Sequence, residues 1–68
     1  MKTCILMFDI PREMNTLRNR VHRKLVKVGA VKLQGSVWSH DEEILVELAE
    51  EIKDAGADAK VFRAEKVF

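Results

Sequence analysis

The sequence predicts an α+β sandwich in which two helices cover one face of an antiparallel sheet. Three observations support this fold class. The 68 residues allow one domain with one small hydrophobic core. Segments with strand character alternate with two amphipathic helical segments, in the order strand, helix, strand pair or bent strand, helix, strand. No linker, repeat or low-complexity segment interrupts residues 1–68. This order is that of a single ferredoxin-like βαββαβ domain.

The first strand is predicted at residues 3–8, where the chain is apolar and contains β-branched and aromatic side chains. An uninterrupted run of this kind is typical of a central strand that is buried on both faces. Asp9, Ile10 and Pro11 follow. Because proline restricts the residue before it and donates no N–H, we expect the strand to end at Asp9 and a loop or helix entry to begin there.

The first helix is predicted at residues 15–28, where an apolar stripe recurs at helical spacing and Gly29 follows as a left-handed cap. The stripe consists of Leu17, Val21, Leu25 and Val28. The remaining positions form a run of bases without an interleaved acid, namely Arg18, Arg20, His22, Arg23, Lys24 and Lys27. Like charges on a helix repel when nothing offsets them, so phosphate binding by this face is favoured over an ordinary solvated face.

Residues 30–39 alternate in polarity around Gln34-Gly35-Ser36, which is typical of a bulge or a tight turn. We therefore expect either two short strands or one bent strand in this region. Trp38 lies at a strand position, as Phe8 does, and both aromatic side chains are more often core residues than base-stacking residues at such positions.

Ser39 and Glu42 have the spacing of a capping box, which predicts that a second helix begins there and ends at Gly56. Its buried stripe is predicted to be Ile44, Leu45, Leu48, Ile52 and Ala55. Its solvent-exposed face is predicted to consist of Glu42, Glu43, Glu47, Glu50, Glu51 and Asp54. Residues 59–68 alternate weakly and predict one final strand, or two.

The two halves of the chain differ in charge. Residues 1–38 carry a net charge of +6 and residues 39–68 a net charge of −5, so a polyanion is expected to approach from one side. The single cysteine, Cys4, cannot form an internal disulfide, which indicates a reducing compartment. No apolar run approaches the roughly 18 residues of a membrane span, and Asp9 comes too early for a signal peptide, so we expect a cytoplasmic protein.

In the predicted topology both helices share one face of the sheet, and the other face stays bare. Val, Phe and Trp side chains on a bare face would form an apolar patch too large for a monomer. Two copies packed sheet to sheet would cover it, so a homodimer is predicted.

Several motifs together resemble the small CRISPR-associated adaptation proteins, the dimeric partner of the CRISPR integrase. The motifs are Phe8-Asp9-Ile10-Pro11, the basic stretch 17–25, Gly29, and Gln34-Gly35-Ser36-Val37-Trp38, within about the first forty residues. The same signature is similar to the related C-terminal domains of phenylacetate-type transcriptional repressors and to the virulence-associated D ribonucleases. The resemblance implies a homodimer that binds duplex DNA or RNA and bridges the integrase during spacer acquisition, with Mg²⁺-dependent endonuclease activity as a further expectation. The alternative is a non-catalytic nucleic-acid-binding or transcription-regulatory module of the same fold.

The resemblance also implies site residues. Asp9 falls on the aspartate implicated in metal-dependent phosphodiester cleavage, and Ser36 on a serine near it on the adjacent strand. Without that role, Asp9 would be a turn former and Ser36 a small polar residue at a bulge. One aspartate cannot hold Mg²⁺ alone, and Glu13 is the only nearby acid in this half of the chain. A two-fold axis is therefore expected to bring two copies of Asp9 together.

Nucleic-acid binding is predicted for six cations that would contact phosphates without reading bases: Arg12, Arg18, Arg20, Arg23, Lys24 and Lys27. His22 is predicted to add a phosphate contact and His40 to lie at a helix entry; neither has the spacing of a zinc ligand. The sequence differs from the adaptation-protein family in two ways. Ser39 stands where that family usually has an acid, and the C-terminal segment is short. Val67 and Phe68 are expected to be a remnant of the strand that the family exchanges across its dimer.

Overall fold

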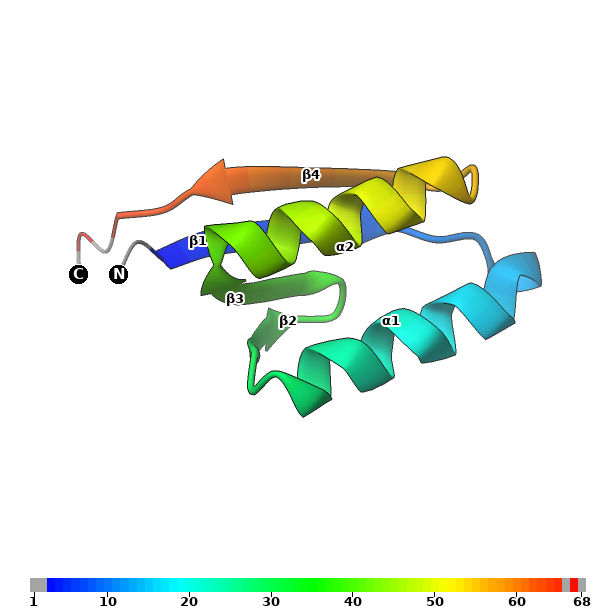
Figure 1. Ribbon diagram of the computed structural model, residues 1–68, viewed down its shortest axis with the longest axis horizontal. Coiled ribbons are helices and arrows are strands. Elements are labelled where there is room, and N and C mark those ends of the chain that lie inside the picture. Colours follow the sequence, from blue (N-terminus) through cyan, green and yellow to red (C-terminus); the bar gives the residue numbers. More distant parts are fainter. Residues whose placement is uncertain (1–2, 66, 68) are drawn as a thin grey trace.

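The computed structural model describes residues 3–65 and residue 67. Two α-helices, one short 3-10 helix and four strands follow the predicted order (Figure 1). In chain order these elements are β1 (Thr3–Asp9), η1 (Arg12–Met14), α1 (Asn15–Lys27), β2 (Val31–Gln34), β3 (Val37–Asp41), α2 (Glu42–Asp54) and β4 (Asp58–Arg63). The predicted α+β fold class is confirmed. Neither α-helix in the described part of the chain has the length and apolarity needed to cross a membrane.

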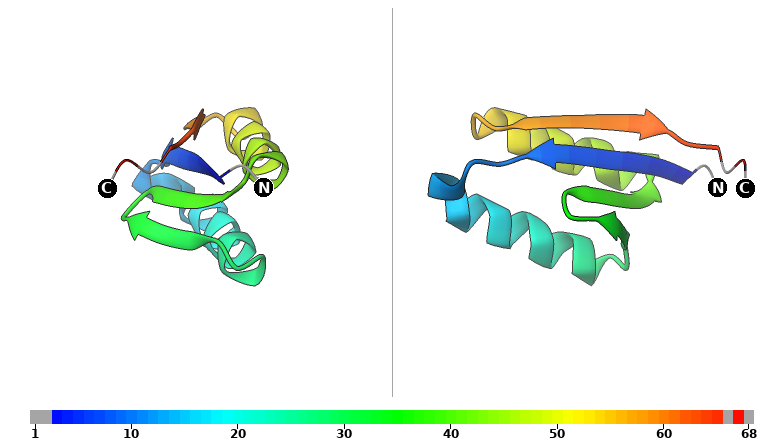
Figure 2. Two further views of the ribbon diagram at one scale, coloured as in Figure 1. Left: turned by 90° about the vertical axis from the view of Figure 1, so that its left-hand side faces the viewer. Right: turned by 180° about the vertical axis from the view of Figure 1, so that it is seen from behind.

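The four strands form one antiparallel sheet in the order β2-β3-β1-β4. Both helices lie on the same side of this sheet, as the end-on view of Figure 2 shows. The first strand is therefore central and the last strand lies on one edge. This arrangement is the ferredoxin-like sandwich that the order of elements predicts.

The core lies between the sheet and the two helices. Side chains of a strand alternate between its faces, and on β1 those of Cys4 and Leu6 point toward the helices and are fully buried. The opposite face of β1 carries Met7, whose side chain is 45% exposed. The prediction that β1 is buried on both faces is therefore wrong for the single chain, because no second layer formed by residues 3–65 and 67 covers the far side of the sheet.

Both helices end in the same way. The N–H of Gly29 donates to the carbonyl of Val26, and the N–H of Ala30 donates to that of Leu25, which is the hydrogen-bond pattern of a Schellman motif. This turn requires a positive φ, and Gly29 has a φ of +79°. Gly56 closes α2 with a φ of +97°. The predicted glycine caps are confirmed at both positions.

The region between the helices forms two strands joined by a turn at Gly35 and Ser36, with a register irregularity between Lys32 and Gln34. The predicted capping box at Ser39 is wrong. Ser39 pairs with Ile5 inside the sheet, since β3 continues to Asp41, and α2 begins only at Glu42 with no side-chain hydrogen bond at its N-cap. Strand pairing with β1 therefore outweighs local capping.

The other predicted boundaries need smaller corrections. Ala55 follows the last residue of α2 and is exposed, while Ala49 joins the buried stripe. The last strand ends at Arg63, earlier than predicted, and Val67 lies outside it with 96% exposure. Phe68, the other part of the expected exchanged strand, lies outside the described residues.

Candidate nucleic-acid interface and acidic strand end

The basic surface of the protein is concentrated on α1. Leu17, Val21 and Leu25 turn inward to the core, and the remaining side chains of this helix are exposed. All six cations predicted to bind nucleic acid are solvent exposed: Arg12 in η1, and Arg18, Arg20, Arg23, Lys24 and Lys27 in α1. The acidic α2 shares the same side of the sheet (Figure 1). The opposite net charges of the two halves of the chain are thus separated mainly between two helices.

Glu51 of α2 forms ion pairs with two of these cations. Its Oε1 lies 2.8 Å from Nε of Arg20, and its Oε2 accepts a hydrogen bond of 2.7 Å from Nζ of Lys24. The hydrogen bond from Lys24 lowers the pKa of Glu51 below the ordinary value of 4.5; attraction to both cations adds to this effect and desolvation opposes it. The expectation that nothing offsets the charges of α1 is therefore wrong. The acid comes from the other helix.

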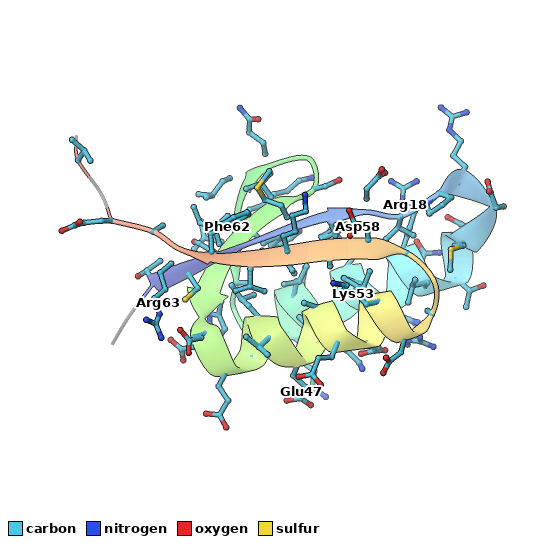
Figure 3. All side chains as sticks on the ribbon, turned by 90° about the horizontal axis from the view of Figure 1, so that it is seen from above. Arg18, Glu47, Lys53, Asp58, Phe62 and Arg63 are labelled. Carbon is cyan, nitrogen blue, oxygen red and sulfur yellow. The ribbon has the colours of Figure 1, made fainter. Side chains whose placement is uncertain are left out.

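Four of the six predicted cations have no such partner. Among the described residues, no carboxylate forms an ion pair with Arg12, Arg18, Arg23 or Lys27. Arg18 lies toward the same end of the molecule as Asp58, whereas Arg63 lies toward the other end (Figure 3). Within the described part of the chain, no carboxylate therefore competes with an external anion for these four cations.

His22 does not simply extend into solvent. Its ring meets the ring of Trp38 edge to face, with the centroids 5.5 Å apart and the planes inclined by 78°. Trp38 is only 4% exposed, which confirms it as a core residue. A shallow concavity beside this contact is lined by Thr16, Asn19, His22 and Arg23.

A second cluster lies where β1 ends. Asp9 is directly opposite Asp58 in the antiparallel pairing of β1 with β4, so both carboxylates lie on the sheet face that the helices leave bare. A pocket beside them is lined by these two residues together with Met7, Phe8 and Lys60. The sequence expectation considered only the first half of the chain, where Glu13 is the nearby acid, whereas Asp58 comes from the second half. Sequence reasoning missed Asp58, although in this topology the start of the last strand must meet the end of the first.

Ser36 lies close to the same strand end. Its carbonyl oxygen accepts a 3.2 Å hydrogen bond from the N–H of Phe8, the residue before Asp9. The resemblance implied that these two residues are near each other, and the structure brings their segments together. The contact between the two segments is a backbone hydrogen bond to the turn that joins β2 and β3.

The donor set at Asp9 fits magnesium better than a metal that needs several protein ligands. Within residues 3–65 and 67, no three His, Cys, Asp or Glu side chains gather in a way that could hold a metal ion. Mg²⁺ usually keeps several waters and binds through one or two carboxylates plus phosphate oxygens of a substrate. Asp9 and Asp58 offer two such carboxylates within one chain, in a pocket that Lys60 also lines.

The opposite end of the sheet holds a structural ion pair. Nε of Arg63 lies 2.8 Å from Oε1 of Glu42, and the same carboxylate oxygen is 3.8 Å from Sγ of the buried Cys4. The hydrogen bond to Glu42 raises the pKa of Arg63. This contact links the beginning of α2 to the end of β4. Asp9 lies at the other end of the β1–β4 pair.

The fold and these two clusters define a small ferredoxin-like domain with a basic helix and an acidic strand end. The model of the family described as the PaaX protein central Cas2-like domain matches residues 2–67. The chain therefore belongs to this Cas2-like family, and the Cas2-like relationship expected from the motifs of the first forty residues is confirmed. The expected C-terminal placement of the related repressor domain is wrong, since the family description calls that domain central. Comparisons with curated proteins and with solved structures find no significant match.

Proposed function

We propose that the protein binds duplex nucleic acid through α1 and η1 as a homodimeric scaffold. The observation that carries this proposal is the set of exposed cations that no acid of the described residues neutralises, namely Arg12, Arg18, Arg23 and Lys27. A duplex presents a regular array of phosphates to which such a surface binds with little sequence preference. The test is the affinity of the protein for a labelled duplex as a function of salt. An affinity that does not fall with added salt would refute it.

The homodimer is proposed to form through the bare face of the sheet. Met7, Val31 and Phe62 all lie on this face and are between 45% and 58% exposed. A monomer rarely exposes a continuous apolar surface of this kind, and a second copy would cover it. Phe62→Glu should convert the dimer to a monomer in sedimentation. Val46→Glu, which adds the same charge at an exposed valine of α2, should not.

Such a dimer suits two biological settings. In CRISPR adaptation it would bridge integrase subunits while holding the duplex, and in transcription regulation it would be a non-catalytic binding module. The family description refers to the PaaX protein, which supports the regulatory setting, since the sequence also resembles the phenylacetate-type repressors. Co-expression with a CRISPR integrase separates the two settings. A stable complex supports adaptation, and duplex binding without complex formation supports regulation. Either role places the protein in the cytoplasm, where its buried cysteine stays reduced.

A second candidate function is Mg²⁺-dependent cleavage of a phosphodiester in DNA or RNA. The position of Asp58 opposite Asp9, together with a pocket at that point, favours it. Asp9 and Asp58 would hold the ion, which would neutralise phosphate charge and activate a water molecule. The Ser36 hydroxyl would orient the phosphate from the adjacent turn.

Asp9→Asn provides the test for this activity. The variant should lose Mg²⁺-dependent cleavage of labelled RNA and DNA while it keeps duplex affinity, because Asp9 lies outside the cations of α1. Asp54→Asn makes the same charge change at the end of α2 and should leave cleavage intact. Cleavage that survives in Asp9→Asn would disprove the catalytic assignment. Absence of cleavage in the wild-type protein would leave only the scaffold function.

A further inference from the structure

The exposed surface of α1 has two flanks with different surroundings. The flank toward α2 carries Arg20, Lys24 and Lys27, and Glu51 contacts the first two of these at 2.8 and 2.7 Å. The other flank, here called the outer flank, consists of Thr16, Asn19, His22 and Arg23, which line one concavity. Residues three and four positions apart are neighbours on a helix, so Thr16, Asn19 and Arg23 form a continuous row.

The outer flank is composed of groups that can donate hydrogen bonds. Arg23 contributes a guanidinium with a fixed fork of N–H donors, Asn19 an amide and Thr16 a hydroxyl. No acid is among the residues that line the concavity, in contrast to the groove on the other flank, which Glu47 and Glu51 enter. A single tetrahedral anion would satisfy several of these donors together.

His22 is held in place beside these donors. The edge contact with Trp38 restricts its ring, and Trp38 is itself fixed in the core by burial. A fixed ring loses less conformational entropy on binding than a long side chain that is free in solvent. The concavity is therefore partly preorganised on the side next to the sheet.

We propose that the outer flank of α1 is the phosphate-binding site, and that Arg20 and Lys24 serve instead to hold α2. The ligand is one phosphodiester group of a duplex backbone in each protomer. This inference rests on the proposed duplex-binding function and deepens it, since it names which side of the basic helix makes the contact. The ligand then lies on the flank of α1 that faces away from the acids of α2.

Arg23→Gln and Arg20→Gln form a matched pair for the test. Both remove one positive charge from an exposed arginine of the same helix. Fluorescence anisotropy with a labelled DNA duplex of about 20 base pairs, two helical turns, measures affinity over a range of salt concentrations. One lost phosphate contact lowers the salt slope by about 0.9, which corresponds to about an eightfold loss of affinity at 0.1 M salt. We expect this loss for Arg23→Gln and less than about a twofold change for Arg20→Gln, because Glu51 holds the Arg20 guanidinium on the flank toward α2, away from the proposed site.

Asn19→Ala adds an independent readout. The amide carries no charge, so its loss should weaken duplex binding without a change in the salt slope. Thermal unfolding monitors the fold of each variant, and the melting temperature of Arg23→Gln should match that of the wild-type protein. An equal loss of affinity in Arg20→Gln and Arg23→Gln, with equal slopes, would overturn the assignment to the outer flank and leave duplex binding itself standing.

Inorganic phosphate distinguishes failure of the site from failure of the proposed function. Titration followed by NMR should shift the signals of Asn19 and Arg23 and leave those of Arg20 and Lys24 in place. These shifts in a protein that binds no duplex would uphold the anion site and refute the duplex-binding function. Shifts spread evenly over all the cations of α1 would refute the site.

Discussion

Glu51→Gln is expected to loosen the packing of α1 against α2. The substitution keeps the size of the side chain and removes the charge that two cations share. The Glu51 side chain is 26% exposed, and those of Arg20 and Lys24 are 46% and 49% exposed, so solvent weakens both pairs. Exposed pairs contribute about 0.2–1 kcal/mol each, which gives about 0.5–2 kcal/mol for the two. In a domain of this size 1 kcal/mol corresponds to about 4–8 °C in melting temperature.

The pH dependence gives this prediction its sign. The pKa of Glu51 is lowered in the folded protein, so the carboxylate stabilises the fold at pH values above its ordinary pKa of 4.5. This contribution disappears as the pH falls through the lower pKa of the folded state. The difference in melting temperature between wild type and Glu51→Gln should therefore have its largest value at pH 7 and disappear in strong acid.

Circular dichroism melts at several pH values measure this difference. Glu50→Gln is the matched control, because Glu50 is an exposed acid on the same helix and forms no ion pair among the described residues. The free energy of unfolding of Glu50→Gln should lie within about 0.5 kcal/mol of the wild-type value, as is usual for surface substitutions. The reasoning fails if Glu50→Gln and Glu51→Gln shift the melt equally, or if the Glu51→Gln difference persists unchanged at low pH.

Three further substitutions test other parts of the fold. Gly29→Ala should cost about 1–2 kcal/mol in a urea titration because φ at Gly29 is +79°, whereas Gly35→Ala, at a glycine without a positive φ, should cost less. Ile52→Ala removes a fully buried side chain and should cost about 2–5 kcal/mol, enough to unfold much of the protein at room temperature; the partly buried Ile44 should tolerate the same change better. Ser39→Ala should change stability by less than the roughly 1 kcal/mol that a lost N-cap costs, since Ser39 caps no helix. If thermal unfolding shows that Ser39→Ala loses about 1 kcal/mol, as for a lost N-cap, the observed start of α2 is contradicted.

The pattern of apolar residues was sufficient to predict the order of the elements. Helical spacing in α1 and the two glycines at helix ends depend on local geometry. The glycine caps and the buried positions Leu17, Val21 and Leu25 are confirmed, whereas Val28 lies just beyond α1 and is exposed. The capping box at Ser39 failed because a local pattern cannot reveal that the same residue pairs with Ile5 across the sheet. Contacts between distant segments thus account for the wrong boundary.

The same distinction applies to the candidate sites. The charges of α1 are visible in the sequence, but Glu51 lies 27 positions beyond Lys24 and only the packing of the helices brings them together. Asp58 likewise becomes a candidate site residue only because strand pairing places it opposite Asp9. The sequence supplied the residue types, whereas the pairing of individual side chains required the tertiary structure.

The pairing of β1 with β4 has a consequence for how this protein can change. Its register sets Asp58 beside Asp9 and, four residues later, turns Phe62 to the same bare face. A slip of one residue would move both side chains to the helix side of the sheet at once. An insertion or deletion in β4 would thus disturb the acidic strand end and the apolar surface together. Substitutions that leave the strand length intact can adjust one without the other.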